Sequence, residues 1–288
     1  MASQQQLKQR IGSVKNTRQI TKAMELVSAS KMRRAQENAI RGREYRTMAL
    51  QILTRLRQLT DVSKHPLYEI RKPKSRLHIV ITSDRGLAGA YNSSVLKQFA
   101  REVMSDRDNG IASFVITIGR QGAQFVSKIE HAQTLGAYTE FPDHPTANDL
   151  QPILATAIEK FTSKEVDFVD VIYTDYKSSI LQEVTHRRLL PVAFNEVELT
   201  DDLSEAIFEP SPTAVLETIT QKLVEVQLYQ DILESLASEQ SSRMMAMKSA
   251  SDNASDIIED LTLAFNTARQ AAITQELAEI TGGAEAIK

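Results

Sequence analysis

The sequence contains no cysteine and no tryptophan, and aromatic residues make up only 6% of its 288 residues. The lack of cysteine excludes disulfides, thiolate metal ligands and thiol nucleophiles. Because large anchoring side chains are scarce, we expect much of the apolar surface to be buried along thin helical seams instead of in one thick core.

Long apolar stretches are also missing. No run approaches the roughly 18 apolar residues that a membrane span needs. The N-terminus is rich in Gln and in basic residues and has no apolar signal core, which argues against a secretory signal. These absences predict a soluble protein of the cytoplasm.

The formal net charge of -3 hides an uneven distribution. Residues 1–76 hold 18 Lys/Arg and 5 Asp/Glu, whereas the rest of the chain holds 16 and 32. A basic arm on an acidic body favours an acidic partner for the arm, such as nucleic acid, an anionic membrane or an acidic protein surface. A solvated helix face accounts for the same charge equally well.

Glycine and proline are absent from residues 213–281, a stretch of 69 residues. At about 1.5 Å per residue, a helix of this length spans roughly 100 Å. Ser211 can cap its start and Pro212 suits the first helical position, while Gly282-Gly283 marks its end.

This segment carries a regular apolar pattern. Alternating steps of three and four residues define 17 positions, of which 14 are apolar. The period is the one at which two helices keep facing each other, so it predicts a coiled-coil seam. The positions are Leu216, Ile219, Leu223, Val226, Gln230, Leu233, Ala237, Gln240, Met244, Met247, Ser251, Ala254, Ile258, Leu261, Phe265, Ala268 and Ala272.

The expected partner helix is the N-terminal segment of the same chain, in which only Gly12 and Gly42 interrupt before Pro66. A seam begins and later resumes at Leu7, Ile11, Val14, Tyr45, Ala49, Ile52, Leu56 and Leu59. Between these two parts, seam positions are occupied by Arg18, Thr21, Glu25 and Ser28. Apolar residues lie on a shifted face instead, at Ile20, Met24 and Val27. A stretch this irregular and basic predicts contact with a molecule other than the partner helix.

Residues 75–210 read as alternating strands and helices, which favours a mainly parallel sheet with helices on its faces. The expected strands are 77–82, 114–118, 168–173 and one within 184–194, and the expected helices are 93–105 and 149–162. The segments 141–145 and 196–209 are expected to be linkers. The predicted fold is therefore a Rossmann-like α/β domain between two long helices that pair as an antiparallel coiled coil, with boundaries at 1–62, 75–210 and 211–284.

A glycine-bearing turn, Ser83 to Asn92, follows the first expected strand at the place where a dinucleotide fold would put its phosphate loop. It matches neither of the glycine-rich phosphate-binding patterns, so a structural turn is the favoured interpretation. The five histidines lack metal-binding spacing, and no nucleophile elbow is present. The sequence thus predicts no cofactor, no metal and no catalytic residues.

The basic run from Lys31 to Arg34 could form a nucleic-acid arm. However, the first aromatic residue of the chain is Tyr45, so this arm offers charge without a platform on which bases stack. Binding of a duplex through its phosphates stays open. A protein partner is favoured.

Three blocks together resemble the gamma subunit of F-type ATP synthases. They read RIGSVKNTRQITKAMELVSASKMRRA at 10–35, SDRGLAGAYN at 83–92 and SSRMMAMKSASDNASDIIEDLTLAFNTARQAAITQELAEITGGA at 241–284, with a shorter match, FEPSP, at 208–212. The third block is highly specific, and the blocks cover both ends and the middle of the chain in the right order.

The resemblance implies a non-catalytic, rotating central stalk of a proton-translocating synthase. Its terminal helices would form a shaft inside a hexamer of α and β subunits, and its α/β domain would form a foot beside the c-ring and the epsilon subunit. No nucleic acid is implied, and the membrane would be reached only through the complex. The implied location is the cytoplasmic face of the inner membrane of a bacterial-type cell, as a peripheral protein.

The family's contact residues map onto matching positions of this chain. Lys22, Met24, Arg33 and Arg34 would lie near acidic loops of β. Shaft contacts and the coupling region would include Arg243, Arg269, Gln270, Thr274 and Glu276. Phe208 and Glu209 would face the c-ring. For each position taken alone, a solvated or seam-packed helix residue remains the competing interpretation.

Two other functions remain open from the residues alone. A coiled-coil scaffold or adaptor with an α/β head would have the same helices. An enzyme would have to use the α/β domain, for which the sequence supplies no recognisable catalytic motif.

Overall fold

The computed structural model describes residues 4–62, 65–193 and 208–285, and the side chains of 41–46 and 282–285 lie outside what it describes. The chain forms two compact units. One consists of Met1–Ser28 and Arg243–Lys288, and the other of Ala29–Ser242. The expected three-part division at 1–62, 75–210 and 211–284 stays a prediction.

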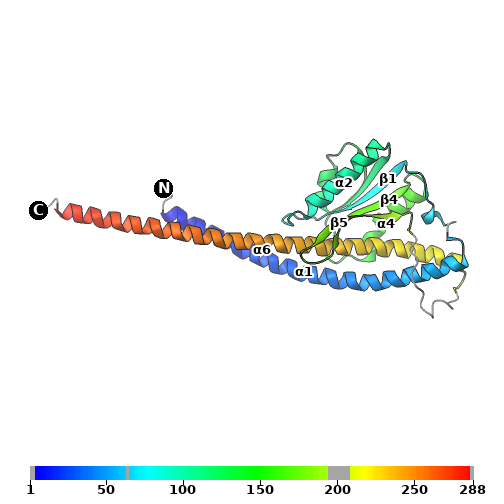
Figure 1. The fold of residues 1–288 in the computed structure, drawn as a ribbon, viewed down its shortest axis with the longest axis horizontal. Helices are drawn as coiled ribbons and strands as arrows, with labels where there is room; N and C mark the ends of the chain where they lie inside the picture. The colour runs from blue at the N-terminus through cyan, green and yellow to red at the C-terminus, as the bar shows by residue number, and fades with distance from the viewer. Residues whose placement is uncertain (1–3, 63–64, 194–207, 286–288) are drawn as a thin grey trace. The chain divides into compact units, whose positions relative to one another are not determined.

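Two long helices contribute to both units (Figure 1). Helix α1 runs from Gln4 to Leu59 and helix α6 from Pro212 to Glu285. The Oγ of Ser211 accepts a hydrogen bond from the backbone N–H of Ala214 at 3.2 Å, so the expected N-terminal cap of α6 is confirmed. The predicted end at Gly282 was too early, because the helix continues to Glu285.

The predicted seam of α6 is confirmed as its inward face. All 17 positions are buried or half-buried. In the α6 part of the first unit, the only side chains from Asp256 to Thr281 that are not exposed are seam members: Ile258, Leu261, Phe265, Ala268 and Ala272. In that unit the side chain of Gln4 donates a hydrogen bond to the carbonyl of Ala268 at 3.3 Å. Pairing of the two helices along their whole length stays a prediction.

The inward face of α1 differs from the expectation. Thr21 and Ser28 are buried, at 9% and 2% exposure, although they are polar. Ile20 and Val27, expected on a shifted apolar face, are instead 60% and 56% exposed. Small polar side chains therefore keep the seven-residue spacing. The hydroxyl of Thr21 stays satisfied by donating to the carbonyl of Arg18 at 3.0 Å.

The second part of the α1 seam also needs correction. Ala49 and Leu56 are buried as expected, and Ile52 is half-buried and packs against the same core, but Leu53, which was not expected on the seam, is more deeply buried at 1% exposure. Leu59 is 45% exposed. The side chain of Tyr45 lies outside the described residues. In this unit Leu53 and Leu56 belong to one core with residues of the first turns of α6, among them Leu216 and Leu223.

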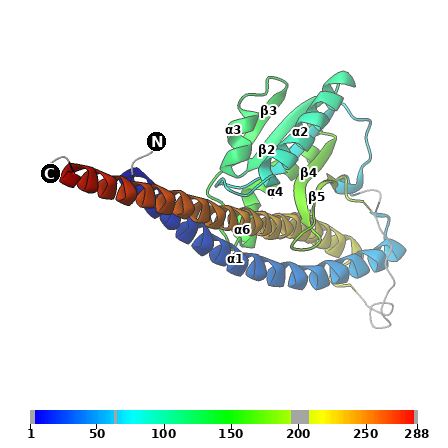
Figure 2. The ribbon, with the colours of Figure 1, turned by 60° about the vertical axis from the view of Figure 1, so that its left-hand side comes forward.

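A five-stranded sheet forms the centre of the second unit (Figures 1 and 2). Its spatial order is β3-β2-β1-β4-β5, in which only the β4–β5 pair is antiparallel. The strands are β1 Ser75–Ile81, β2 Ala112–Ile118, β3 Ala132–Tyr138, β4 Phe168–Tyr176 and β5 Gln182–Leu190. The mainly parallel sheet is confirmed.

Successive side chains of β1 point to opposite faces of the sheet and contribute to two separate hydrophobic cores. Leu77, Ile79 and Ile81 face a core that includes α4 (Ala147–Thr162). Val80 faces a smaller core with α2 (Tyr91–Asp108). Figures 1 and 2 show these two helices on opposite faces of the sheet. Their periodic apolar residues explain why both were predicted from the sequence.

Sequence patterns missed the edge strand β3 and the short helices α3 (Arg120–Val126) and η2 (Pro66–Tyr68). Strand β3 is rich in small residues, and none of its side chains is fully buried, so its alternation is weak. The segment 141–145 is no free linker, because Phe141 packs on the larger core and the carbonyl of Pro145 accepts from Tyr229 at 3.2 Å. Most of the other expected linker, 196–209, lies outside the described residues.

Candidate functional site

The expected contact residues of the helices lie mostly on exposed surface. Arg33 and Arg34 on α1 are exposed, as are Arg269, Gln270, Thr274 and Glu276 on α6. Lys22 is exposed and forms an i,i+3 ion pair with Glu25 at 3.0 Å, and Met24 is half-buried. Such a distribution suits contacts spread along two helices, and no concave pocket is needed for it.

Three expected contact residues have other surroundings. Arg243 is only 7% exposed, so its guanidinium is held within this chain. Phe208 is half-buried and packs against the larger core, whereas the adjacent Glu209 is exposed. The expected residues are neighbours along α1, along α6 or in the segment just before α6, and their roles toward partners stay predictions.

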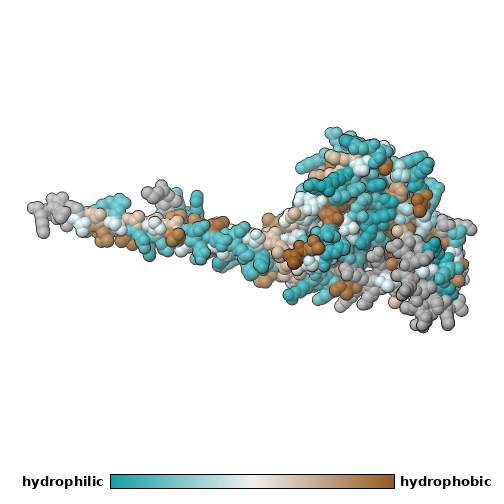
Figure 3. All heavy atoms as spheres, in the orientation of Figure 1, coloured by the Kyte–Doolittle hydropathy of each residue, from teal (hydrophilic) through white to brown (hydrophobic). Residues whose placement is uncertain are grey.

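Exposed apolar side chains on both helices were missed by the sequence reasoning or assigned to other faces. On α1 they include Ile20, Leu26 and Val27. On α6 they are Met245, Ile257, Leu263, Ile273, Leu277 and Ile280. On the face drawn in Figure 3, apolar side chains are interspersed with hydrophilic ones along the C-terminal part of α6. The sequence does contain a signal for these exposed apolar side chains, because they lie outside the seam positions, on helix faces that would be polar if they met only solvent.

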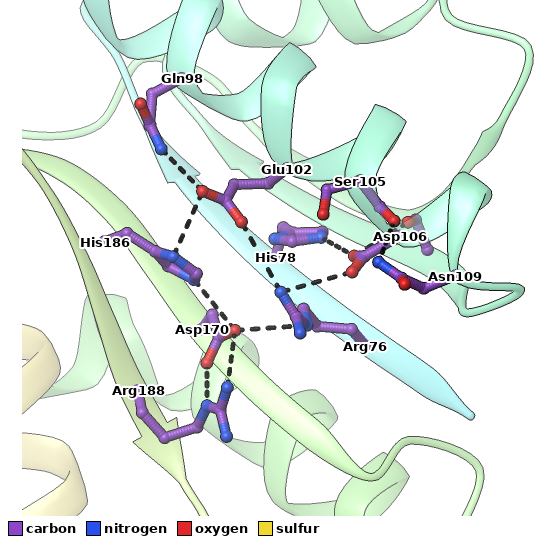
Figure 4. Close-up of polar contacts among 11 residues, drawn as sticks. Arg76, His78, Gln98, Glu102, Ser105, Asp106, Asn109, Asp170, His186 and Arg188 are labelled. Atoms are coloured by element: carbon purple, nitrogen blue, oxygen red, sulfur yellow. Dashed lines mark hydrogen bonds and ion pairs between the residues drawn. The ribbon is translucent and has the colours of Figure 1, made fainter. Parts of the chain in front are cut away.

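A charged network lies on the α2 side of the sheet (Figure 4). Its centre is Asp170 of β4, whose side chain is fully buried. The carboxylate accepts from Arg188 of β5, from Nε2 of His186 at 3.0 Å and lies 3.4 Å from Nε of Arg76 in β1. The other ring nitrogen of His186 lies 3.5 Å from Glu102 of α2. One strand carboxylate thus gathers three basic side chains.

The same network continues under α2. Nη1 of Arg76 lies 3.4 Å from the buried carboxylate of Asp106. Nε2 of the buried His78 lies 2.9 Å from that carboxylate, and the hydroxyl of Ser113 donates to it at 3.3 Å. Four strands (β1, β2, β4 and β5) and helix α2 are therefore joined by ion pairs and hydrogen bonds. None of these residues was singled out by sequence reasoning, because they are scattered along more than 100 residues.

The network is a structural brace. The hydrogen bond to Asp170 is the main reason that the pKa of His186 is raised, against the effect of its partial burial. Burial acts against ionisation of Asp170, but His186 and Arg188 outweigh it and its pKa is lowered. The described residues contain no group of three or more His, Cys, Asp or Glu arranged to hold a metal. Its carboxylates are instead paired with basic side chains of the same chain.

The raised pKa of His186 predicts a pH dependence. Its charge stabilises the folded state fully below the ordinary pKa of 6.5, and this contribution is lost as pH rises through the raised pKa. We expect the stability difference between the native chain and His186→Gln to shrink by about 1.5 kcal/mol between slightly acidic and alkaline pH. Urea unfolding followed across pH measures it. A difference that is constant with pH would contradict an imidazolium at this position.

The turn from Ser83 to Asn92 is held by its own side chains. The carboxylate of Asp84 accepts from three backbone N–H groups, of Arg120 at 2.9 Å, Glu140 at 3.0 Å and Phe141 at 3.1 Å. Asn92 accepts from the N–H of Ser83 at 3.0 Å. The Asp84 carboxylate thus accepts from the first N–H of α3 and from two N–H groups of the segment that follows β3. This geometry supports the interpretation as a structural turn that ties three loops at one end of the sheet.

Loss of the Asp84 carboxylate should loosen these loops. We expect Asp84→Ala to lower the free energy of unfolding by about 2 kcal/mol, because three N–H groups lose a charged acceptor. Glu140→Ala is the matched control, since Glu140 pairs with Arg120 at 2.8 Å on the exposed surface and should cost less than about 1 kcal/mol. Thermal unfolding compares the variants, and equal effects would refute the special role of Asp84.

Comparison with known proteins addresses the whole chain. A family model described as ATP synthase matches residues 3–287. An ATP synthase gamma chain from Geobacter metallireducens is 41% identical over 290 residues, with 100% of both chains covered. The chain belongs to the ATP synthase gamma chain family. Another member of this family, from Macrococcus caseolyticus, is 39% identical, again with 100% of both chains covered.

Solved structures agree with this family membership. A chain of the central stalk and c-ring assembly of Tetrahymena thermophila mitochondrial ATP synthase aligns with a TM-score of 0.60 at 26% identity, covering 81% of this chain and 99% of that one. A chain of the Euglena gracilis mitochondrial ATP synthase aligns with a TM-score of 0.64, covering 98% and 93%, and at 17% identity it supports the fold alone.

The gamma-chain family was predicted from three sequence blocks, and the comparisons confirm it. The blocks contain most of the expected contact residues, but the charged network around Asp170 lies outside them. No helix in the described part of the chain is long and apolar enough to cross a membrane.

Proposed function

We propose that the chain is the rotating central-stalk subunit of a proton-translocating F-type ATP synthase. In this role it couples rotation of a c-ring to ATP synthesis or hydrolysis at a hexamer of α and β subunits. The observation that carries the proposal is the full-length identity of about 40% to gamma chains, because it includes both long helices and the α/β domain.

The helices supply the physical basis for a shaft. We propose that α1 and α6 pair as an antiparallel coiled coil, since both keep an inward face at seven-residue spacing. The outer faces mix basic and apolar side chains, among them Lys22, Arg33 and Ile20. Exposed ion pairs contribute only about 0–1 kcal/mol each. Weak contacts of this kind let a shaft leave one neighbour for the next.

The proposed shaft also implies contacts between this chain and the other subunits. We propose that Lys22, Met24, Arg33 and Arg34 face acidic loops of β. The proposed contacts of the coupling region are Arg243, Arg269, Gln270, Thr274 and Glu276. Phe208 and Glu209 are proposed to face the c-ring, next to the epsilon subunit.

The chain itself would not be catalytic. ATP chemistry would belong to the hexamer, so this subunit needs no bound cofactor and no nucleic acid. The proposed location is the cytoplasmic face of the inner membrane, where the chain is held peripherally through the c-ring. The α/β domain would then act as a foot that receives torque.

Co-purification tests the proposal against a scaffold or adaptor with the same helices. A tagged chain expressed in its own cells is expected to bring down two kinds of ATPase subunit in a fixed ratio, in a complex that hydrolyses ATP. A chain that purifies alone, or with a partner unrelated to ATPases, would refute the rotor assignment. Turnover of a substrate by the α/β domain alone would support an enzyme instead.

A further inference from the structure

Part of helix α6 is buried on nearly all sides, yet it is polar. From Leu228 to Ser241, every side chain except those of Tyr229 and Leu236 is buried. The buried polar residues include Asp231 and Ser235, both at 0% exposure, and Glu234 at 6%. Burying such groups is costly unless they find partners, so this stretch must serve more than apolar packing.

The polar residues share one face of the helix. Asp231, Glu234, Ser235, Ser238 and Ser241 follow one another at steps of one or three residues, which places them on one side of the helix. The seam members Leu233, Ala237 and Gln240 lie on a different stripe. Helix α6 therefore has two inward faces within this unit, an apolar one on the seam and a polar one for the sheet.

An ion pair dominates the polar face. Nη1 of Arg187 in β5 lies 2.5 Å from Oδ1 of Asp231. The guanidinium also lies over the ring of Tyr173, 5.2 Å from its centroid. Burial acts to lower the pKa of Arg187, but Asp231 together with Tyr173, Glu234 and Asp175 outweighs it, and the pKa is raised. The phenol of Tyr173 donates to Glu234 at 3.4 Å.

Hydrogen bonds from two other elements extend the contact. The hydroxyl of Tyr91, at the start of α2, lies 2.7 Å from that of Ser235. The turn between β4 and β5 is bound at the end of the stripe, where Ser241 donates to the carbonyl of Ser179 at 2.9 Å and accepts from Gln182 at 3.3 Å. Together the contacts span about three helical turns.

Directionality separates this contact from the apolar seam. Apolar packing is non-directional, so a helix can rotate among alternative packings at modest cost. A buried ion pair adds little net stability, but it strongly penalises any arrangement that leaves one charge without its partner. Rotation of α6 by one residue about its axis would separate Asp231 from Arg187 and carry Ser235 away from Tyr91.

We propose that this polar joint, made by Asp231, Glu234, Ser235 and Ser241 with Arg187, Tyr173, Tyr91 and Ser179, is the connection through which torque passes between the α/β domain and α6. Asp231 is its central positioning residue. The inference rests on the proposed rotor function. It adds which contacts prevent the helix from turning relative to the sheet when force is applied.

The test uses the intact synthase complex in membrane vesicles, with ATP hydrolysis and ATP-driven proton uptake measured together. For Asp231→Asn we expect the ratio of protons moved to ATP hydrolysed to fall about threefold or more, while hydrolysis continues. Lys222→Gln is the matched control, because it removes an exposed ion pair with Glu225 on the same helix, and its ratio should equal that of the native complex.

A second variant, which keeps the packing, distinguishes loss of the joint from misfolding of Asp231→Asn. Tyr91→Phe removes one hydroxyl of the joint and keeps its packing, so it should lower the ratio in the same direction. A disulfide supplies the rescue, since the native chain has no cysteine. In Asp231→Asn with Ser179→Cys and Ser241→Cys, oxidation should restore the ratio and reduction should abolish it again.

The outcomes separate the two proposals. If vesicles hydrolyse ATP and their proton uptake is the same with and without this chain, the rotor function itself is refuted. If native vesicles pump and Asp231→Asn and Tyr91→Phe pump equally well, the joint carries no torque. A disulfide that forms in the assembled complex but does not restore the ratio would also overturn the joint.

Discussion

A disulfide between the outer face of α1 and a β subunit should stop ATP turnover, and reduction should restore it. The expected loss is at least about tenfold, because turnover would be limited by a shaft that cannot pass on to the next conformation. The native chain has no cysteine. An engineered thiol is therefore the only one that this subunit contributes to any cross-link.

Ala23→Cys is the suitable variant. Ala23 is small, exposed and adjacent to the expected contact residues Lys22 and Met24. The second cysteine belongs on the acidic loop of β that is expected to face it. ATP hydrolysis is measured after oxidation and again after addition of dithiothreitol, with the extent of cross-linking read from gels.

Two controls make the result decisive. Ala23→Cys combined with native β should keep full activity under oxidation, as should the double variant before oxidation. A position near Ala268 on α6 provides a second, independent site for the cross-link. Full hydrolysis by a complex that is completely cross-linked at either site would rule out shaft rotation as the coupling step.

Asp170→Asn should cause the largest loss of stability among single substitutions in the α/β domain. The change leaves three basic side chains, Arg188, His186 and Arg76, without the buried carboxylate that they share. Removing one partner of a buried ionic group costs about 3–5 kcal/mol. Its effect is expected first in β4 and β5, where hydrogen exchange of backbone amides should become faster.

Asp108→Asn is the matched control. Asp108 lies on α2 and pairs with Arg107 at 2.9 Å, with both side chains more than half exposed. This substitution should change the free energy of unfolding by less than about 0.5 kcal/mol. A loss below about 1 kcal/mol for Asp170→Asn would show that the network is dispensable for the fold.

The lowered pKa of Asp170 predicts how the loss of stability in Asp170→Asn depends on pH. Its ionised form stabilises the folded state at any pH above the ordinary pKa of 3.8, and the contribution is lost as pH falls through the lowered pKa. His186 acts in the opposite direction at higher pH. The network should therefore stabilise the fold most between these two limits, and the difference between native chain and Asp170→Asn should be largest there.

Local periodicity determined much of this protein from sequence alone. The seam of α6 was predicted position by position, because helical spacing is a property of nearby residues. Strands β1, β2 and β4 were predicted for a similar reason, since they are short apolar runs that the sheet buries on both faces. The family also followed from the sequence, through blocks at both ends and in the middle.

Only the tertiary structure decided which side chains meet across the chain. Thr21 and Ser28 face inward while Ile20 and Val27 stay exposed, because the available space and the spacing of the helix overrule the polarity of single residues. Asp170 and Asp231 find their basic partners on β5, since the antiparallel pairing of β4 with β5 and the docking of α6 bring distant residues together. An ionic contact depends on such juxtaposition in space, and no period along the sequence encodes it.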